Sequence, residues 1–141
     1  MPKFLLRCFS ASCFIFVMTG LLNANQASAQ ELLPEKGWLF APGDNLRRAA
    51  IDFDDRDWKS IEVPAYWNKA GVSAKDGFGW YRLHISLPPG KEALELVIKG
   101  LAGEDETYFN GKKIGSTGEL SGDFSNPKYV IRTYTVPADL R

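Results

Sequence analysis

The sequence is poor in cysteine and histidine. Its two cysteines, Cys8 and Cys13, lie near the N-terminus, and His84 is the single histidine. A domain that begins after Cys13 therefore contains no thiol, which excludes disulfides, thiolate metal ligands and a cysteine nucleophile from it. A zinc site built on histidine, or a histidine relay that activates a serine, would have to centre on His84.

The sequence also lacks an excess of charge of either sign. Seventeen Lys and Arg residues balance seventeen Asp and Glu residues. A chain without a basic field has no general attraction to phosphates, so we expect no nucleic-acid partner. The length of 141 residues suits one domain rather than two.

The N-terminal segment has the pattern of a secretory signal peptide. Basic residues precede an apolar stretch over residues 9–22, and the small-residue triplet Ala27-Ser28-Ala29 follows it. That order predicts a signal peptide over residues 1–29, cleaved after Ala29. An uncleaved membrane anchor and a lipoprotein signal ending at Cys13 are the alternatives, although the apolar run is short for a span, which needs roughly 20 residues.

Removal of the signal peptide would leave residues 30–141 as one domain without a transmembrane segment. Because a signal peptide directs a chain across the inner membrane, we expect this domain in the periplasm or the extracellular space. Without disulfide bonds, the domain depends on its hydrophobic core for stability.

The remaining chain is patterned for strands. No stretch of ten or more residues repeats apolar side chains at i, i+3, i+4 and i+7. The clearest strand is residues 80–87, where apolar side chains alternate with Arg82, His84 and Ser86, as in a half-buried antiparallel strand. The only helix expected lies in the signal peptide, besides a single turn capped by Asp54. Strands are predicted at residues 37–40, 80–87, 95–99, 107–109, 112–115 and 129–136.

The dipeptide Asn110-Gly111 lies between two of these strands. Asn-Gly is the strongest short-range hairpin signal, because both turn positions favour positive φ. Short strands separated by turns, with no helices between them, predict an all-β sandwich.

An ordered set of motifs runs through the domain. It comprises Asp52-x-Asp54-Asp55-x-Asp57-Trp58, Ile61-x-Val63-Pro64, Trp67, Gly79-Trp80-Tyr81-Arg82 and the segment from Glu106 to Gly115. This set resembles the sugar-binding N-terminal domain of glycoside hydrolase family 2, within the galactose-binding-like jelly-roll superfamily. The resemblance covers roughly residues 38–141 and implies a jelly-roll β-sandwich. In the family, catalysis belongs to a separate barrel domain, so the resemblance implies a non-catalytic accessory domain.

The chain departs from that family at two places. Residues 116–120 read Ser-Thr-Gly-Glu-Leu where the family commonly has a His-x-Gly-Gly-Tyr type of stretch. This version is more similar to the extracellular sensor regions of bacterial signalling proteins. The family also follows the turn at residues 136–141 with a final strand, which this sequence does not include. We expect a longer parent protein, and the alternative is a sandwich with one strand fewer and an exposed edge.

Two acidic clusters are candidate sites for a cation or for catalysis. Asp52, Asp54, Asp55 and Asp57 offer oxygen ligands for calcium, but they lack the glycine and distal glutamate of an EF-hand, and a solvated, capping turn is favoured. The second cluster, residues 104–106, is expected to be solvated or to pair with Arg82 across the sheet. No spacing selects two carboxylates as a glycosidase pair, so we predict no catalytic residue, no metal and no cofactor.

Aromatic residues provide the functional lead, because sugar rings pack on aromatic faces while their hydroxyls bind polar side chains. Loops at one end of a sandwich are common binding surfaces. For this loop, however, packing that plugs the end of the sandwich is favoured over ligand binding, and Trp58 and Trp80 are expected to be core residues. The candidate ligand-binding residues are Tyr66, Trp67, Asn68, Asp76, Arg82, Glu106 and Asn110.

These observations lead to three functional hypotheses. The first is an exported, non-catalytic carbohydrate-binding or ligand-sensing module of a larger protein. The second is an accessory sugar-binding domain of a secreted, β-galactosidase-like glycoside hydrolase whose catalytic domain lies outside this chain. The third is a structural interaction domain without a sugar site.

Overall fold

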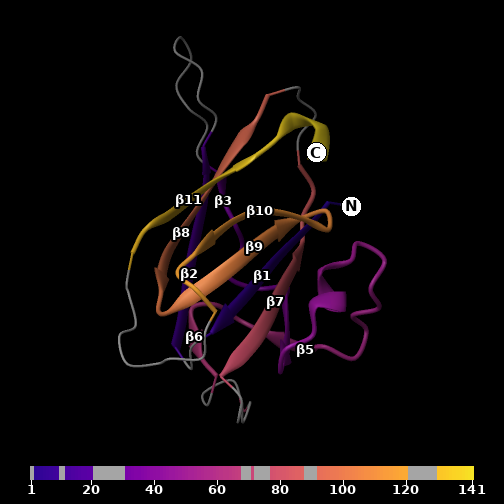
Figure 1. Ribbon diagram of the computed structural model, residues 1–141, viewed down its shortest axis with the longest axis vertical. Helices are drawn as coiled ribbons and strands as arrows, with labels where there is room; N and C mark the ends of the chain where they lie inside the picture. The colour runs from indigo at the N-terminus through magenta and orange to yellow at the C-terminus, as the bar shows by residue number, and fades with distance from the viewer. Residues whose placement is uncertain are drawn as a thin grey trace.

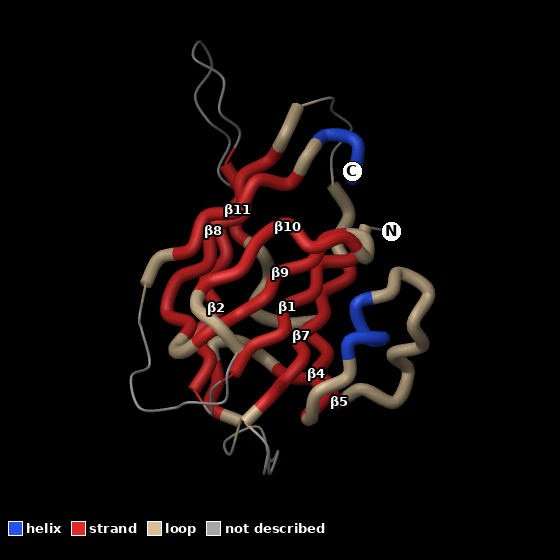
Figure 2. Tube along the Cα trace, in the orientation of Figure 1, coloured by secondary structure: helices blue, strands red, loops and turns tan. Residues whose placement is uncertain are grey.

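The computed structural model describes residues 2–9, 12–20, 31–67, 71, 77–87, 92–120 and 130–141. Strands dominate these residues, and helix is confined to two short 3-10 turns (Figure 1, Figure 2). The strands are β1 (Lys3–Phe9), β2 (Ser12–Gly20), β3 (Glu31–Leu32), β4 (Trp38–Pro42), β5 (Lys59–Ile61), β6 (Ala65–Tyr66), β7 (Phe78–His84), β8 (Leu94–Leu101), β9 (Glu104–Phe109), β10 (Lys112–Thr117) and β11 (Arg132–Val136), and the turns are η1 (Leu46–Ala49) and η2 (Ala138–Leu140).

The strands form two sheets. The larger sheet has the order β10-β9-β1-β7-β4-β5, and the smaller has the order β11-β8-β2-β3, with β6 also paired to β2. Every strand pair found among the described residues is antiparallel. Figure 1 shows β10, β9, β1 and β7 side by side, with β11, β8 and β2 in the other layer. The all-β prediction is confirmed, and the arrangement is consistent with a β-sandwich.

The core lies between the two sheets. The larger sheet contributes aromatic residues such as Trp38, Phe40 and Tyr81, each at most 1% exposed. The smaller sheet contributes aliphatic residues such as Leu96 and Ile98. The centres of the Phe40 and Tyr81 rings lie 4.8 Å apart in an edge-on contact, the geometry that aromatic pairs prefer.

Most strand predictions are confirmed, with shifted ends. The predicted strand at residues 80–87 is β7, which begins and ends earlier, and its apolar side chains Tyr81 and Leu83 point into the core as expected. The runs at 95–99 and 129–136 correspond to β8 and β11. Asp54 caps its turn as predicted, because its carboxylate accepts a hydrogen bond from the Arg56 N–H at 3.1 Å.

The predicted Asn-Gly hairpin is confirmed as the connection between β9 and β10. Asn110 has φ 46° and Gly111 has φ 83°, the left-handed values that such a turn requires. In β10, a Cβ atom on Gly115 would lie 2.1 Å from the Tyr134 ring. Only glycine therefore allows β10 to approach β11 this closely.

The N-terminal segment differs from the prediction. The helix expected within the signal peptide is absent from its described residues, which form β1 and β2 instead. Alternation explains β1, because Phe4 and Leu6 enter the core while Leu5 packs on the opposite face with Trp80. The aromatic and β-branched residues 14–17 also favour a strand. Cleavage after Ala29 remains a prediction.

Candidate functional site

The aromatic loop predicted to bind ligand is only partly within the described residues. Asn68 and Asp76 lie outside them. Tyr66 lies in β6 and is 44% exposed, whereas Trp67 is 2% exposed and belongs to the core. The Trp67 indole N–H donates to the Tyr81 hydroxyl. Trp67 therefore packs in the core, as the favoured interpretation of this loop predicted.

Arg82 is buried on the outer face of the larger sheet, under the segment that contains η1. Its guanidinium donates to Asp55 Oδ2 at 2.9 Å, to the Phe53 carbonyl at 3.1 Å and to the Arg48 carbonyl. It also lies 4.7 Å from the centre of the Trp58 ring, a cation–π distance. These contacts hold Trp58 against the sheet and leave the ring partly exposed.

His84 lies on the solvent side of these Arg82 contacts. Its Nε2 lies 2.7 Å from Asp55 Oδ2, and 33% of its side chain is exposed. Burial by itself raises the pKa of Asp55, but hydrogen bonds with Arg82 and His84 outweigh it and hold that pKa below its usual range. We call Asp55, Trp58, Arg82 and His84 the Trp58 cluster. It combines an aromatic ring, a carboxylate and an imidazole on one surface.

The pairing of Arg82 with the acidic cluster at residues 104–106 is not found. Glu106 instead accepts hydrogen bonds from Arg7 and Lys113, each at 2.7 Å, and from the Tyr108 hydroxyl at 2.9 Å. The prediction was wrong because neighbouring strands set the partners. β1 and β10 flank β9, whereas Arg82 lies in β7, on the far side of β1.

Glu106 also makes stability dependent on pH. Burial raises its pKa, but the hydrogen bonds from Lys113, Arg7 and Tyr108 outweigh burial and lower the pKa to about 2. An unfolded glutamate titrates near pH ~4.3. A carboxylate with a lowered folded pKa contributes stability above the unfolded pKa, and that stability is lost as the pH falls towards 2.

Replacing Glu106 with glutamine should therefore flatten the acid side of the stability curve. Urea unfolding of the full chain between about pH 5 and pH 2 should show a smaller loss for Glu106→Gln than for the wild type. Glu62→Gln is the matched control, because the Glu62 side chain is 69% exposed and pairs with the equally exposed Lys36. Parallel curves for the wild type and Glu106→Gln would contradict this assignment.

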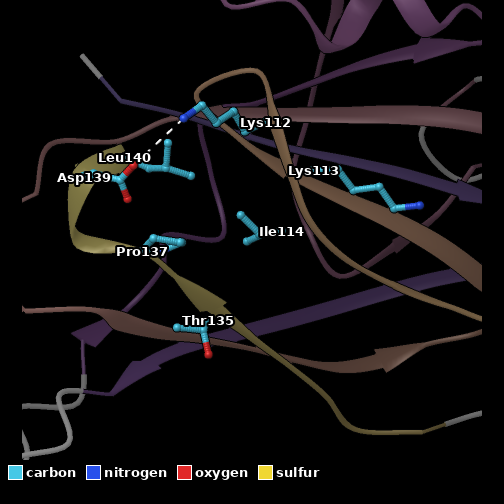
Figure 3. Close-up of a pocket in the computed structure, with 7 residues that line it drawn as sticks. All are labelled: Lys112, Lys113, Ile114, Thr135, Pro137, Asp139 and Leu140. Carbon is cyan, nitrogen blue, oxygen red and sulfur yellow. Dashed lines mark ion pairs between the residues drawn. The ribbon is translucent and has the colours of Figure 1, made fainter.

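A hollow lies beside the β9–β10 hairpin. It has a volume of about 250 Å³, and Figure 3 shows an ion pair between Lys112 and Asp139 at its edge. Asn110 does not line it but helps to build it, because its side-chain amide donates to the Leu140 carbonyl at 2.6 Å and holds η2 against the hairpin. The lining residues are Lys112, Lys113, Ile114, Thr135, Pro137, Asp139 and Leu140.

The five predicted ligand residues that the structure describes do not converge on one site. Tyr66 and Trp67 belong to the sandwich end, whereas Arg82, Glu106 and Asn110 belong to three separate groups of contacts. The expectation that Trp58 is a core residue is wrong, because Trp58 is only partly buried beside Arg82 on the outer face of the sheet. The sequence also missed Asp55 as the shared partner of Arg82 and His84. The alternation in β7, which puts Arg82 and His84 on one face, was the available signal.

Within the part of the chain that the structure describes, no three His, Cys, Asp or Glu side chains lie close enough together to hold a metal ion. Among the same residues, no helix has the length and hydropathy needed to cross a membrane.

The fold and these surfaces define a class, an antiparallel all-β domain with a polar and aromatic cluster on the outer face of its larger sheet. Comparison with curated proteins finds a similarity to the β-galactosidase BoGH2A of Bacteroides ovatus, with 26% identity over 92 residues. The match covers 55% of this chain and 11% of that enzyme. No protein-family model matches the chain, and no solved structure does. This chain thus spans a small part of the relative's length.

Proposed function

We propose that this chain is an exported, non-catalytic carbohydrate-binding accessory domain of a glycoside hydrolase-like protein. The proposal includes the jelly-roll topology and the cleaved signal peptide predicted from the sequence. The alternative is a sensor module of a signalling protein, which would also bind its ligand without catalysis.

The similarity to a β-galactosidase carries this proposal. The shared segment is 11% of that enzyme, a fraction suited to an accessory domain rather than to a whole catalytic unit. The all-β architecture with two sheets is compatible with such a role. Fold alone does not assign activity, so the binding surface must be argued from its residues.

The Trp58 cluster is the surface we propose for the sugar. The Trp58 ring, over which the guanidinium groups of Arg82 and Arg48 lie at 4.7 and 5.7 Å, is partly exposed and offers apolar surface for the C–H groups of a pyranose. Asp55 and His84 offer polar atoms for its hydroxyls. Arg82 holds Asp55 and Trp58 in place from below. Groups that are already oriented lose less entropy on binding. A shallow surface of this kind gives millimolar affinity, equivalent to about 4 kcal/mol.

Glycan binding by the full chain tests this proposal. We expect weak, saturable binding to neutral sugars on an array, followed by titration. His84→Ala should weaken binding roughly 2- to 13-fold, as the loss of one hydrogen bond of about 0.5–1.5 kcal/mol predicts. Asp139→Ala, in the hollow beside the hairpin, should leave affinity unchanged. Folded protein that binds no glycan would favour a structural interaction domain instead.

A further inference from the structure

Arg48 adds a positive charge at the border of the Trp58 cluster. It belongs to η1, which lies beside the larger sheet (Figure 2), and its carbonyl accepts a hydrogen bond from Arg82 in β7. The Arg48 guanidinium lies 5.7 Å from the centre of the Trp58 ring. A ligand that contacts the exposed part of this ring is therefore within reach of the guanidinium.

Main-chain carbonyls at the end of β4 hold the Arg48 guanidinium in place. Its Nη1 donates to the carbonyls of Pro42 and Gly43, each at 2.9 Å. Its Nε and Nη2 make no hydrogen bond within the described residues, and neither is among the buried nitrogens that lack a partner. These two nitrogens are therefore open to solvent. A guanidinium with two donors in one plane can bind both oxygens of a carboxylate.

Arg48 forms no ion pair in the described part of the chain, because the carboxylates near it bind other arginines. Asp44 Oδ2 lies 2.6 Å from Arg7, and Asp55 Oδ2 lies 2.9 Å from Arg82. Burial lowers the pKa of Arg48, and the negative charge of Asp44 offsets only part of this effect. An additional anion beside Arg48 would thus stabilise its charged form.

The acidic turn that precedes Trp58 does not supply this anion. Asp54 pairs with Arg56 at 2.6 Å. Asp52 and Asp57 are exposed, and the pKa of Arg48 responds to Asp44 rather than to either of them. The surface formed by the Trp58 cluster and Arg48 therefore has two arginines for the single carboxylate of the cluster, and its net charge is positive.

We propose that the preferred ligand of the Trp58 cluster is an acidic sugar, a uronic acid residue, and that Arg48 determines this specificity by binding its carboxylate. This inference rests on the proposed function and names the class of sugar. The pyranose ring contacts Trp58, its hydroxyls bind Asp55 and His84, and its C-6 carboxylate accepts hydrogen bonds from Nε and Nη2 of Arg48. Neutral sugars bind the same surface more weakly, because they lack the ion pair.

Two matched ligands test the inference, the methyl α-glycosides of galacturonic acid and of galactose, titrated into the full chain at neutral pH and followed by NMR. The galacturonide should bind about fivefold more tightly, the upper end of the range for an exposed ion pair. In Arg48→Gln the ratio of the two affinities should fall to about one, because the ion pair is lost. Arg47→Gln is the matched control and should keep the preference, since Arg47 is an exposed arginine of the same turn.

The salt dependence of the wild-type chain covers the case in which Arg48→Gln does not fold. The preference for the galacturonide should shrink between about 0.02 M and about 0.5 M salt, because dissolved ions screen exposed charges. Equal affinity of the wild type for the two sugars, or an acid preference that persists in folded Arg48→Gln, would overturn this inference and leave the proposed function standing. Folded wild-type protein that binds neither sugar would overturn both.

Discussion

Replacing Arg132 with methionine is expected to lower the free energy of unfolding by about 3–5 kcal/mol, the range for breaking a buried ion pair. The side chains of Arg132 and Asp105 are both fully buried and form an ion pair. Arg132 also donates to the Leu101 carbonyl at 2.8 Å and the Val130 carbonyl at 2.9 Å. Methionine would leave the Asp105 carboxylate and these carbonyls without their strongest donor.

Chemical denaturation at neutral pH measures this effect. Arg56→Met is the matched control, because Arg56 is 86% exposed and pairs only with Asp54 among described residues; it should change stability by at most about 0.5 kcal/mol. The double variant Arg132→Met with Asp105→Leu should recover part of the loss, because it removes the stranded charge as well. A near-neutral Arg132→Met would show that the ion pair is not buried in solution.

Replacing Trp80 with alanine should cost about 3–5 kcal/mol, as for other buried tryptophans, and lower the melting temperature by more than about 10 °C. Trp80 is fully buried on the outer face of the larger sheet, where its ring lies 5.8 Å from Tyr108 and beneath the Arg7 guanidinium. Alanine would open a cavity between the sheet and these side chains.

Trp80→Phe separates packing from hydrogen bonding. The Trp80 indole nitrogen has no hydrogen-bond partner in the described residues, so phenylalanine loses volume but no hydrogen bond. Its cost should therefore be well below that of alanine. A melting temperature unchanged by Trp80→Ala would mean that the ring is exposed, and Trp80 would then join the candidate sugar-binding residues.

The sequence predicted those parts of the fold that depend on local patterns. Alternation placed Tyr81 and Leu83 in the core, and the Asn110-Gly111 dipeptide located the hairpin. These predictions succeeded because a period of two and a positive-φ turn are properties of neighbouring residues. Burial of Trp80 was also predicted, since a tryptophan in a strand of a small sandwich has few other places to pack.

The partners of charged residues were not predictable in the same way. Arg82 pairs with Asp55, 27 positions earlier, and Arg7 pairs with Glu106, 99 positions later. The strand order brings these groups together, and no local pattern encodes that order. The hollow beside the hairpin was missed for the same reason, because the Asn110 contact with Leu140 builds its wall.

The sequence by itself determined the all-β class, the turns and the alternation of buried and exposed side chains, because backbone preferences and hydrophobic periodicity act over a few residues. Only the tertiary structure decided which strands are neighbours, which carboxylate each arginine meets and that residues 3–9 lie in the middle of a sheet. A strand's own pattern specifies which face it buries. Its place in the sheet depends on the unpaired main-chain groups and the apolar space that distant strands leave for it.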